Sequence, residues 1–201
     1  MSIRAVGFDY LGVLTTQGGG QSTSSHIAAI TGLDRGQLYA AYDRHSRELQ
    51  SGGLSVDELW ALVAHEIGAA SRTAEVVAAA HVAAPPLDPA MVQLVDDLRA
   101  SGYRVGLLSN LSGQWVDDLR SAHFGRHFDA ELYSSDIGLA KPDPRTYQLL
   151  AEQLGIATSE LLFIDDSAYN LTGVEQLGIT PVLFRGRDTL LRDLRNHDLP
   201  V

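Results

Sequence analysis

The sequence predicts an α/β fold in which helices cover both faces of a parallel sheet, with an additional helical segment inserted. Beyond Pro86, short apolar segments typical of buried strands alternate with segments of helical spacing. Such alternation is typical of a parallel sheet that is covered on both faces. Between Ser22 and Val82, in contrast, the apolar spacing is helical throughout, and Gly or Ser interrupts it. We therefore expect one chain with two differently built parts.

The composition is that of a globular domain, or of one with a modest insertion. Of the 201 residues, 45% are apolar and 20% are charged. The chain has no cysteine, which excludes a disulfide framework, thiolate chemistry and Cys-ligated zinc. Its 15 basic and 25 acidic residues give a formal charge of −10 without a Lys/Arg cluster, so we expect no nucleic-acid partner.

Membrane insertion and secretion are not expected. No apolar run approaches the ~20 residues that span a bilayer. The apolar start reaches Asp9 too soon to form the apolar core of a signal peptide. We therefore expect a cytoplasmic protein with no membrane partner, present as a monomer or a homodimer.

The first expected element is a short buried strand over residues 3–8, closed by Asp9 and the turn-prone Gly12. The helical stretch that follows is predicted to hold four helices. Its candidate N-caps are Asp34 and Ser55, and its candidate stops are Gly52-Gly53 and Gly68. Four helix–strand pairs come next. The helices are expected at 89–100, 113–122, 144–154 and 168–177, and the strands at 103–108, 130–133, 161–164 and 180–184. We assign residues 1–16 and 86–201 to an α/β domain and residues 17–85 to a helical domain.

Polar residues gather where the expected strands end. Asp9, Ser109-Asn110 and Asp165-Asp166 each follow a strand directly, and Lys141 lies on a loop after the strand at 130–133. Binding sites in open parallel sheets lie beyond the carboxyl ends of the strands. This edge of the sheet is therefore the candidate site.

Four segments at these strand ends carry a family resemblance. They are Phe8-Asp9-Tyr-Leu-Gly-Val-Leu14, Leu108-Ser109-Asn110, Lys141-Pro142-Asp143-Pro144 and Phe163-Ile-Asp165-Asp166, which resemble, in this order, the four motifs of the haloacid dehalogenase superfamily. The helical stretch is similar to the cap domain of that superfamily, so the likeness covers essentially the whole chain. It implies a Rossmann-like core with an inserted α-helical cap. The segments from Asp165 to Asn170 and from Gly173 to Thr180 resemble small sugar-phosphate phosphatases, including those that act on glucose 1-phosphate.

The resemblance implies that Asp9 is a nucleophile that attacks phosphorus and forms an aspartyl-phosphate. Taken alone, Asp9 is better explained as a residue that caps a turn. Asp165 and Asp166 are adjacent carboxylates that repel each other unless a cation lies between them, and Mg²⁺ suits them because it prefers hard oxygen ligands. The alternative is a solvated N-cap pair. Asp9 and the backbone carbonyl of Leu11 are expected to complete the metal site.

The phosphate group has its own expected partners. The Ser109 hydroxyl can donate to a phosphoryl oxygen, and Tyr10, Leu11 and Asn110 are predicted to complete the cradle. Lys141 supplies a positive charge for the phosphoryl group and the nucleophile. The following proline disfavours helical backbone at Lys141. The alternatives are an N-cap serine and a surface lysine.

Leu11 departs from the family pattern. Most phosphatases of this superfamily carry a second Asp, the acid and base, two residues after the nucleophile. Leucine cannot transfer a proton, a loss of ~10²–10⁴ in rate if nothing replaces it. The glucose-1-phosphate type also lacks that Asp, so the resemblance does not imply a dead enzyme. His26 is the first alternative proton donor.

Three functions follow from these residues. The leading one is a Mg²⁺-dependent phosphatase for a small phosphorylated metabolite, such as a sugar phosphate. The second is a metal-independent haloacid dehalogenase, which Asp165 and Asp166 argue against. The third is a non-catalytic phosphate-binding regulatory module, which only Leu11 supports. Arg44, His45 and Arg47 can meet an anionic substrate, but a solvated helix face accounts for them better.

Overall fold

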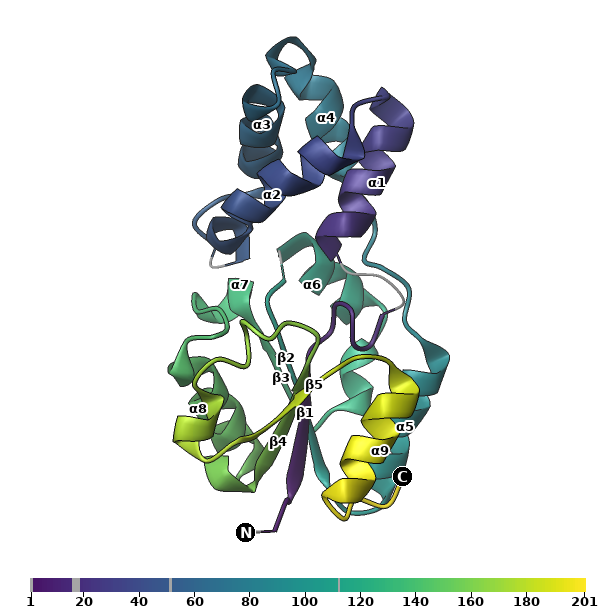
Figure 1. Cartoon of the computed structure of the whole chain (residues 1–201), viewed down its shortest axis with the longest axis vertical. Helices are drawn as coiled ribbons and strands as arrows, with labels where there is room; N and C mark the ends of the chain where they lie inside the picture. Colours follow the sequence, from purple (N-terminus) through teal and green to yellow (C-terminus); the bar gives the residue numbers. More distant parts are fainter. Residues whose placement is uncertain (1, 16–18, 51, 112) are drawn as a thin grey trace.

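The computed structural model describes residues 2–15, 19–50, 52–111 and 113–201, with the backbone alone for residues 19–22. Its α/β part is built on one five-stranded parallel sheet with the strand order β3-β2-β1-β4-β5 (Figure 1). The strands are β1 (Ala5–Phe8), β2 (Arg104–Ser109), β3 (Ala130–Tyr133), β4 (Leu161–Asp165) and β5 (Thr180–Leu183). The predicted parallel sheet is confirmed, with each strand within two residues of its expected bounds.

Helices cover both faces of this sheet, as predicted. In Figure 1, α8 lies on one side of the strands, and α5 and α9 lie on the other. The helices and 3₁₀ turns of this part are α5 (Pro89–Ala100), α6 (Gly113–Ser121), η2 (Phe124–His127), α7 (Ser134–Ile137), α8 (Pro144–Leu154), η3 (Thr158–Glu160), η4 (Val174–Leu177) and α9 (Arg187–Asn196). The side chains of β1 point alternately to the two faces of the sheet. Val6 and Phe8 pack in the core under α5 and α9, whereas Ala5 packs in the core under α8.

Two glycines in the sheet make room for α8. Gly7 of β1 pairs with Gly106 of β2 on one side and with Phe163 of β4 on the other. A Cβ atom at Gly7 would lie 2.5 Å from the ring of Phe163, and one at Gly106 would lie 2.8 Å from Leu150 of α8. Because neither contact is sterically possible, glycine at both positions allows the Phe163 ring and α8 to pack directly on the strands.

The remaining helices form a bundle of their own, which lies beyond the carboxyl ends of the strands (Figure 1). They are α1 (Gly19–Thr31), α2 (Arg35–Gln50), α3 (Val56–Glu66), η1 (Ala70–Arg72) and α4 (Thr73–Ala80). The bundle has its own apolar core, in which Trp60 is buried and stacks on Tyr42. Ser55 and Glu58 form a capping box at the start of α3, and Asp34 accepts from the Gln37 amide at the start of α2. The expected domain boundary between residues 16 and 17 lies outside the described residues.

One prediction of secondary structure is wrong, and one helix was missed. The helix expected at 168–177 is a turn followed only by η4, because Gly173 adopts a φ of 79° that a right-handed helix cannot continue through. Helix α9 was not expected, although Leu190 and Leu194 lie one turn apart on its buried face. In the described part of the chain, no helix has the length and apolar character needed to cross a membrane.

Candidate active site

The carboxyl ends of the strands and helix α2 enclose a cavity of about 740 Å³. Six of the eight predicted site residues line it from the sheet side, namely Asp9, Leu11, Ser109, Asn110, Lys141 and Asp166. From the bundle side, α2 contributes a polar and aromatic wall that includes Tyr39, Tyr42, Asp43 and Arg47. The parallel strands thus bring residues from four distant parts of the sequence to one cavity, as the positions of the motifs predicted.

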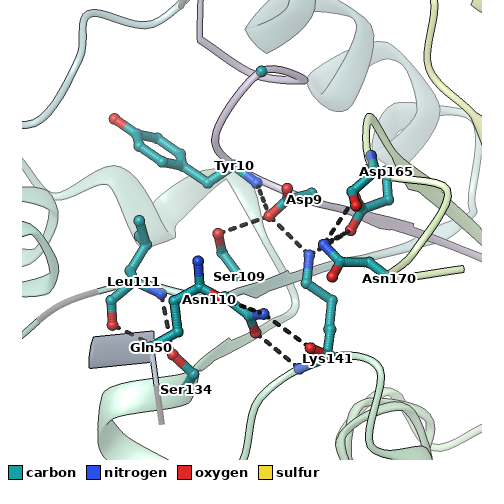
Figure 2. Close-up of polar contacts among 12 residues, drawn as sticks. Asp9, Tyr10, Gln50, Ser109, Asn110, Leu111, Ser134, Lys141, Asp165 and Asn170 are labelled. Carbon is teal, nitrogen blue, oxygen red and sulfur yellow. Dashed lines mark hydrogen bonds and ion pairs between the residues drawn. The ribbon is translucent and has the colours of Figure 1, made fainter. Parts of the chain in front are cut away.

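Asp9 is buried and is held through one of its two oxygens (Figure 2). Its Oδ1 accepts from the backbone amide of Tyr10 and the hydroxyl of Ser109, both at 2.7 Å, and lies 2.9 Å from Lys141 Nζ. In the described part of the chain, Oδ2 of Asp9 receives no hydrogen bond. The carboxylate is therefore fixed in orientation while one oxygen remains available to attack or to bind a cation.

Burial dominates the ionisation of Asp9. It raises the pKa of this carboxyl from 3.8 to about 7, and the negative charge of Asp165 adds to the rise, whereas Lys141 and Ser109 oppose it. A cation placed beside Asp9 would favour its charged form. The carboxyl of Asp9 therefore ionises near neutral pH, and its charge depends on the cations around it.

Lys141 is the only lysine in the chain. Its fully buried ammonium bridges Asp9 and Asp165, with Nζ 2.6 Å from Oδ2 of Asp165. Burial alone would lower the pKa of Lys141, but the attraction of the two carboxylates outweighs it and the pKa is raised. Lys141 therefore stays charged between two acids, which excludes the alternative of a surface lysine.

Asn110 positions Lys141 through the backbone. The side-chain amide of Asn110 donates to the carbonyl of Lys141 at 3.1 Å and accepts from its backbone amide at 2.9 Å (Figure 2). The same nitrogen also lies 3.2 Å from Oε1 of Gln50 at the end of α2. The contacts of Asn110 thus fix the loop that carries the lysine and connect it to the bundle.

Asp165 and Asp166 differ sharply although they are adjacent. Asp165 is fully buried, and both of its oxygens are occupied by the amide of Ser167, the side chain of Asn170 and Lys141. Asp166 is exposed to the cavity, and its pKa is raised by partial burial and by the charge of Asp165. One oxygen each of Asp9, Asp165 and Asp166 lie within 4.8 Å of one another. Three carboxylates at this spacing, with a single lysine among them, fit a divalent cation that prefers oxygen ligands.

The three residues that follow Asp9 in the loop after β1 have different surroundings. The Tyr10 ring points away from Asp9 (Figure 2), and its hydroxyl donates to the carbonyl of Pro85 inside the core, so only the backbone of Tyr10 reaches the site. Leu11 is partly buried and lines the cavity. Gly12 has a φ of 76°, and a Cβ there would lie 2.1 Å from Oδ2 of Asp166. Glycine therefore allows the loop to pass directly beside that carboxylate.

Several residues of the site were not predicted. Asn170, which holds Asp165, lies within a segment whose resemblance was noted, but its role follows only from the fold. Arg47 reaches the cavity and its guanidinium lies over the ring of Tyr169, 4.3 Å from the centroid, so a solvated helix face does not describe it. Arg44 also lines the cavity, but its guanidinium forms an ion pair with Glu66 of α3, which His45 contacts as well. His26 is exposed on α1, and no histidine is among the described residues that line the cavity.

Comparison with known proteins decides the family. Residues 3–178 match the family described as haloacid dehalogenase-like hydrolase. The chain belongs to this family. The resemblance of its four motifs is thereby confirmed, and the protein is a hydrolase of the haloacid dehalogenase-like type.

The relatives of this haloacid dehalogenase-like hydrolase include three kinds of enzyme. A protein named phosphatase MT3486, from Mycobacterium tuberculosis, is 31% identical over 96% of this chain and 94% of its own length. Bifunctional epoxide hydrolase 2 of Sus scrofa is 35% identical over 52% of this chain, which spans only 20% of that protein. (S)-2-haloacid dehalogenase 4A of Burkholderia cepacia is 30% identical over 47% of this chain and 41% of its own length.

Solved structures share the fold along almost the whole chain. A predicted HAD-like family hydrolase from Porphyromonas gingivalis has a TM-score of 0.70 at 24% identity and covers 97% of this chain and 99% of its own. A HAD family enzyme of Bacteroides thetaiotaomicron, solved with magnesium and inorganic phosphate, has a TM-score of 0.66 at 22% identity over 93% of this chain and 97% of its own. These likenesses show that the sheet and the helical bundle occur together in other proteins of this fold.

Proposed function

We propose that the protein is a Mg²⁺-dependent phosphatase that hydrolyses a small phosphorylated metabolite through an aspartyl-phosphate on Asp9. The observation that carries the proposal is the arrangement around Asp9. Its Oδ1 is held by Ser109, Lys141 and a backbone amide while Oδ2 stays available, and the exposed carboxylate of Asp166 lies beside it. A fixed carboxylate next to a buried positive charge is what in-line attack on a phosphoryl group requires.

The residues divide the work of the first step. Asp9 attacks phosphorus, and the ester oxygen leaves. The hydroxyl of Ser109 and the ammonium of Lys141, both already within hydrogen-bond distance of Asp9 Oδ1, can turn toward phosphoryl oxygens and stabilise the charge that develops on them. Water then cleaves the aspartyl-phosphate. Asp9 leaves as a carboxylate, which needs no proton, so the second step depends less on an acid than the first.

Mg²⁺ bound at this site supplies a further charge that neutralises phosphoryl oxygens. Asp166 is the residue best suited to ligate it directly, because its carboxylate faces the cavity and receives no hydrogen bond from the described side chains. Asp165 has no oxygen free of hydrogen bonds, so it holds Lys141 and contributes negative charge from beneath. Asp9 and the carbonyl of Leu11 complete the proposed ligand set. The enzyme with magnesium and phosphate described above supports this choice of cation.

A metal-independent dehalogenase is the second candidate, because Leu11 removes the usual acid and a haloacid dehalogenase is among the relatives. The exposed Asp166 opposes it. A third carboxylate beside Asp9 and Asp165 would repel a carboxylate substrate unless a cation neutralised it. The cavity of about 740 Å³ fits a small phosphorylated metabolite, and the segment likeness favours a sugar phosphate.

Metal dependence separates the candidates. Hydrolysis of 4-nitrophenyl phosphate and of 2-chloropropionate is followed for protein treated with EDTA and then supplied with Mg²⁺. We expect phosphate release only with Mg²⁺, and no halide release. The same assays are run on Asp166→Asn, which removes the proposed metal ligand. Asp188→Asn, a change at an exposed acid on α9 outside the cavity, is the matched control for that variant. Equal rates with and without EDTA would contradict the phosphatase, and the absence of both reactions would favour the binding module.

A further inference from the structure

Two arginines of α2 line the cavity opposite the strand ends, and they differ in their partners. Arg44 forms an ion pair with Glu66 of α3, so its charge is already compensated within the bundle. Arg47 has no carboxylate within ion-pair distance in the part of the chain that the structure describes. Its guanidinium lies instead over the Tyr169 ring, 4.3 Å from the centroid. Arg47 is thus an uncompensated cation at the wall of the catalytic cavity.

Stacking leaves the binding edge of Arg47 free. A guanidinium that lies on an aromatic ring uses its face, while its N–H donors point outward in the ring plane, where they match a carboxylate or a phosphate. Tyr169 belongs to the loop after β4, which also carries Asp165 and Asp166. The stack therefore holds the guanidinium over the loop that carries two of the site's carboxylates.

The acid that could neutralise Arg47 within its own helix does not do so. Asp43 lies four residues earlier on α2, at a spacing where Asp–Arg pairs form, and it also lines the cavity. The Arg47 guanidinium nevertheless lies on Tyr169 rather than on Asp43. Such helix pairs are weak in any case, whereas a charge-assisted, two-pronged contact to a ligand inside a cavity is stronger. An incoming anion can therefore compete for Arg47.

We propose that Arg47 binds a second anionic group, a carboxylate or a second phosphate, on the leaving group of the phosphate ester. In the proposed reaction the transferred phosphoryl group lies at Asp9 and Lys141, so Arg47, which α2 brings into the same cavity, contacts the other end of the substrate. The inference rests on the proposed phosphatase function and narrows it. The substrate class becomes the phosphorylated acids and the bisphosphates. In a chain with a formal charge of −10, Arg47 also offsets the repulsion that such a substrate meets.

The test uses esters that differ only in the group at the far end. Glucose 1-phosphate, glucuronic acid 1-phosphate and glucose 1,6-bisphosphate share one leaving oxygen and differ at carbon 6. Glycerol 3-phosphate and 3-phosphoglycerate form a shorter pair. For the wild type we expect kcat/KM to be at least about tenfold higher for a charged member than for its neutral counterpart. Arg47→Gln should lower this ratio about tenfold, mainly through KM, and Arg47→Lys should restore part of it. The carboxylate and phosphate arms show which anion Arg47 accepts.

A binding measurement keeps this test separate from the test of the phosphatase reaction. In Asp9→Asn protein, which lacks the nucleophile, calorimetry with the same esters should show that Arg47→Gln weakens the charged members selectively. Arg35→Gln, at an exposed position in the first turn of α2 outside the cavity, is the control. Equal losses for neutral and charged esters would overturn the inference, because Arg47 would then bind the transferred phosphoryl group. A wild-type protein that shows no preference for charged over neutral esters would overturn the inference as well. Selective binding without turnover of any ester would uphold the Arg47 site and reject the phosphatase.

Discussion

The side-chain amide of Asn110 forms two hydrogen bonds with the backbone of Lys141: it donates to the carbonyl and accepts from the amide. Asn110 directly follows β2, and Lys141 lies on the loop after β3, so the contact joins two neighbouring strand ends. The charge of Lys141 is useful only if Nζ stays between Asp9 and Asp165. The two hydrogen bonds of Asn110 therefore position Lys141.

Asn110→Ala should therefore reduce catalysis without unfolding the protein. Loss of both hydrogen bonds frees the Lys141 loop, and a misplacement of about 1 Å in an active site can cost on the order of 10²-fold in rate. We expect kcat to fall between about tenfold and a hundredfold, with a far smaller change in the midpoint of thermal unfolding. Steady-state kinetics with a saturating ester measures it. A kcat within twofold of the wild type would show that the loop holds Lys141 unaided.

Asp165 and Asp166 should respond differently to removal of their charge. Asp166→Asn is predicted to weaken Mg²⁺ binding while stability is kept, because this carboxylate faces the cavity. Asp165→Asn leaves Lys141 with one acid fewer in a buried network, and breaking a buried ion pair costs about 3–5 kcal/mol. Urea unfolding and Mg²⁺ titration of both variants provide the comparison. Similar stability losses in the two variants would contradict the division of roles.

Stability of the metal-free protein should fall with rising pH because of Asp9. The pKa of this carboxyl is about 7 in the folded protein against 3.8 for the unperturbed group, so the folded state keeps a proton that the unfolded state releases. The stabilisation is fully present below pH 3.8 and is lost as pH rises through about 7. Urea unfolding in EDTA at several pH values, for the wild type and Asp9→Asn, tests this. The advantage of the wild type over the variant should shrink between pH 4 and 7, and a constant difference would argue against a raised pKa.

The absence of an acid at Leu11 should make the enzyme sensitive to its leaving group. No histidine lines the cavity within the described residues, so an alkoxide departs without evident help. We expect esters of acidic alcohols, such as anomeric sugar phosphates and aryl phosphates, to react faster than simple alkyl phosphates. Leu11→Asp should narrow the gap, because a carboxyl there can donate a proton. Rates across esters of graded leaving-group acidity give the slope for both proteins. A flat slope in the wild type would reveal another proton donor.

The sheet and the position of the site were predictable from sequence because strand ends in a parallel sheet must meet at one edge. Gly12 was singled out as a turn residue, and its positive φ and its contact with Asp166 give the physical reason. The orientation of individual side chains was not predictable in the same way. Tyr10 belongs to the first motif, yet its ring is buried against Phe124 because the chain turns immediately after Asp9.

Contacts between the bundle and the sheet lay beyond what the sequence could predict. Arg47 and Tyr169 are 122 positions apart in the sequence, so no local pattern pairs them, and periodicity on α2 alone favoured a solvated face. The helix expected at 168–177 failed for a related reason. Asn170 turns its side chain to Asp165, and Gly173 then takes a left-handed conformation, so the requirements of the site replace local helix preference.

Chemical trapping of the intermediate tests whether Asp9 becomes phosphorylated during turnover. The protein is mixed with an activated aryl phosphate and Mg²⁺, quenched in acid during turnover, and digested for mass spectrometry. We expect one phosphoryl group on the carboxylate of Asp9, and none in EDTA or in the Asp9→Asn variant. Turnover that proceeds while Asp9 stays unmodified, or a phosphoryl group that forms equally well without a metal, would contradict the proposed reaction.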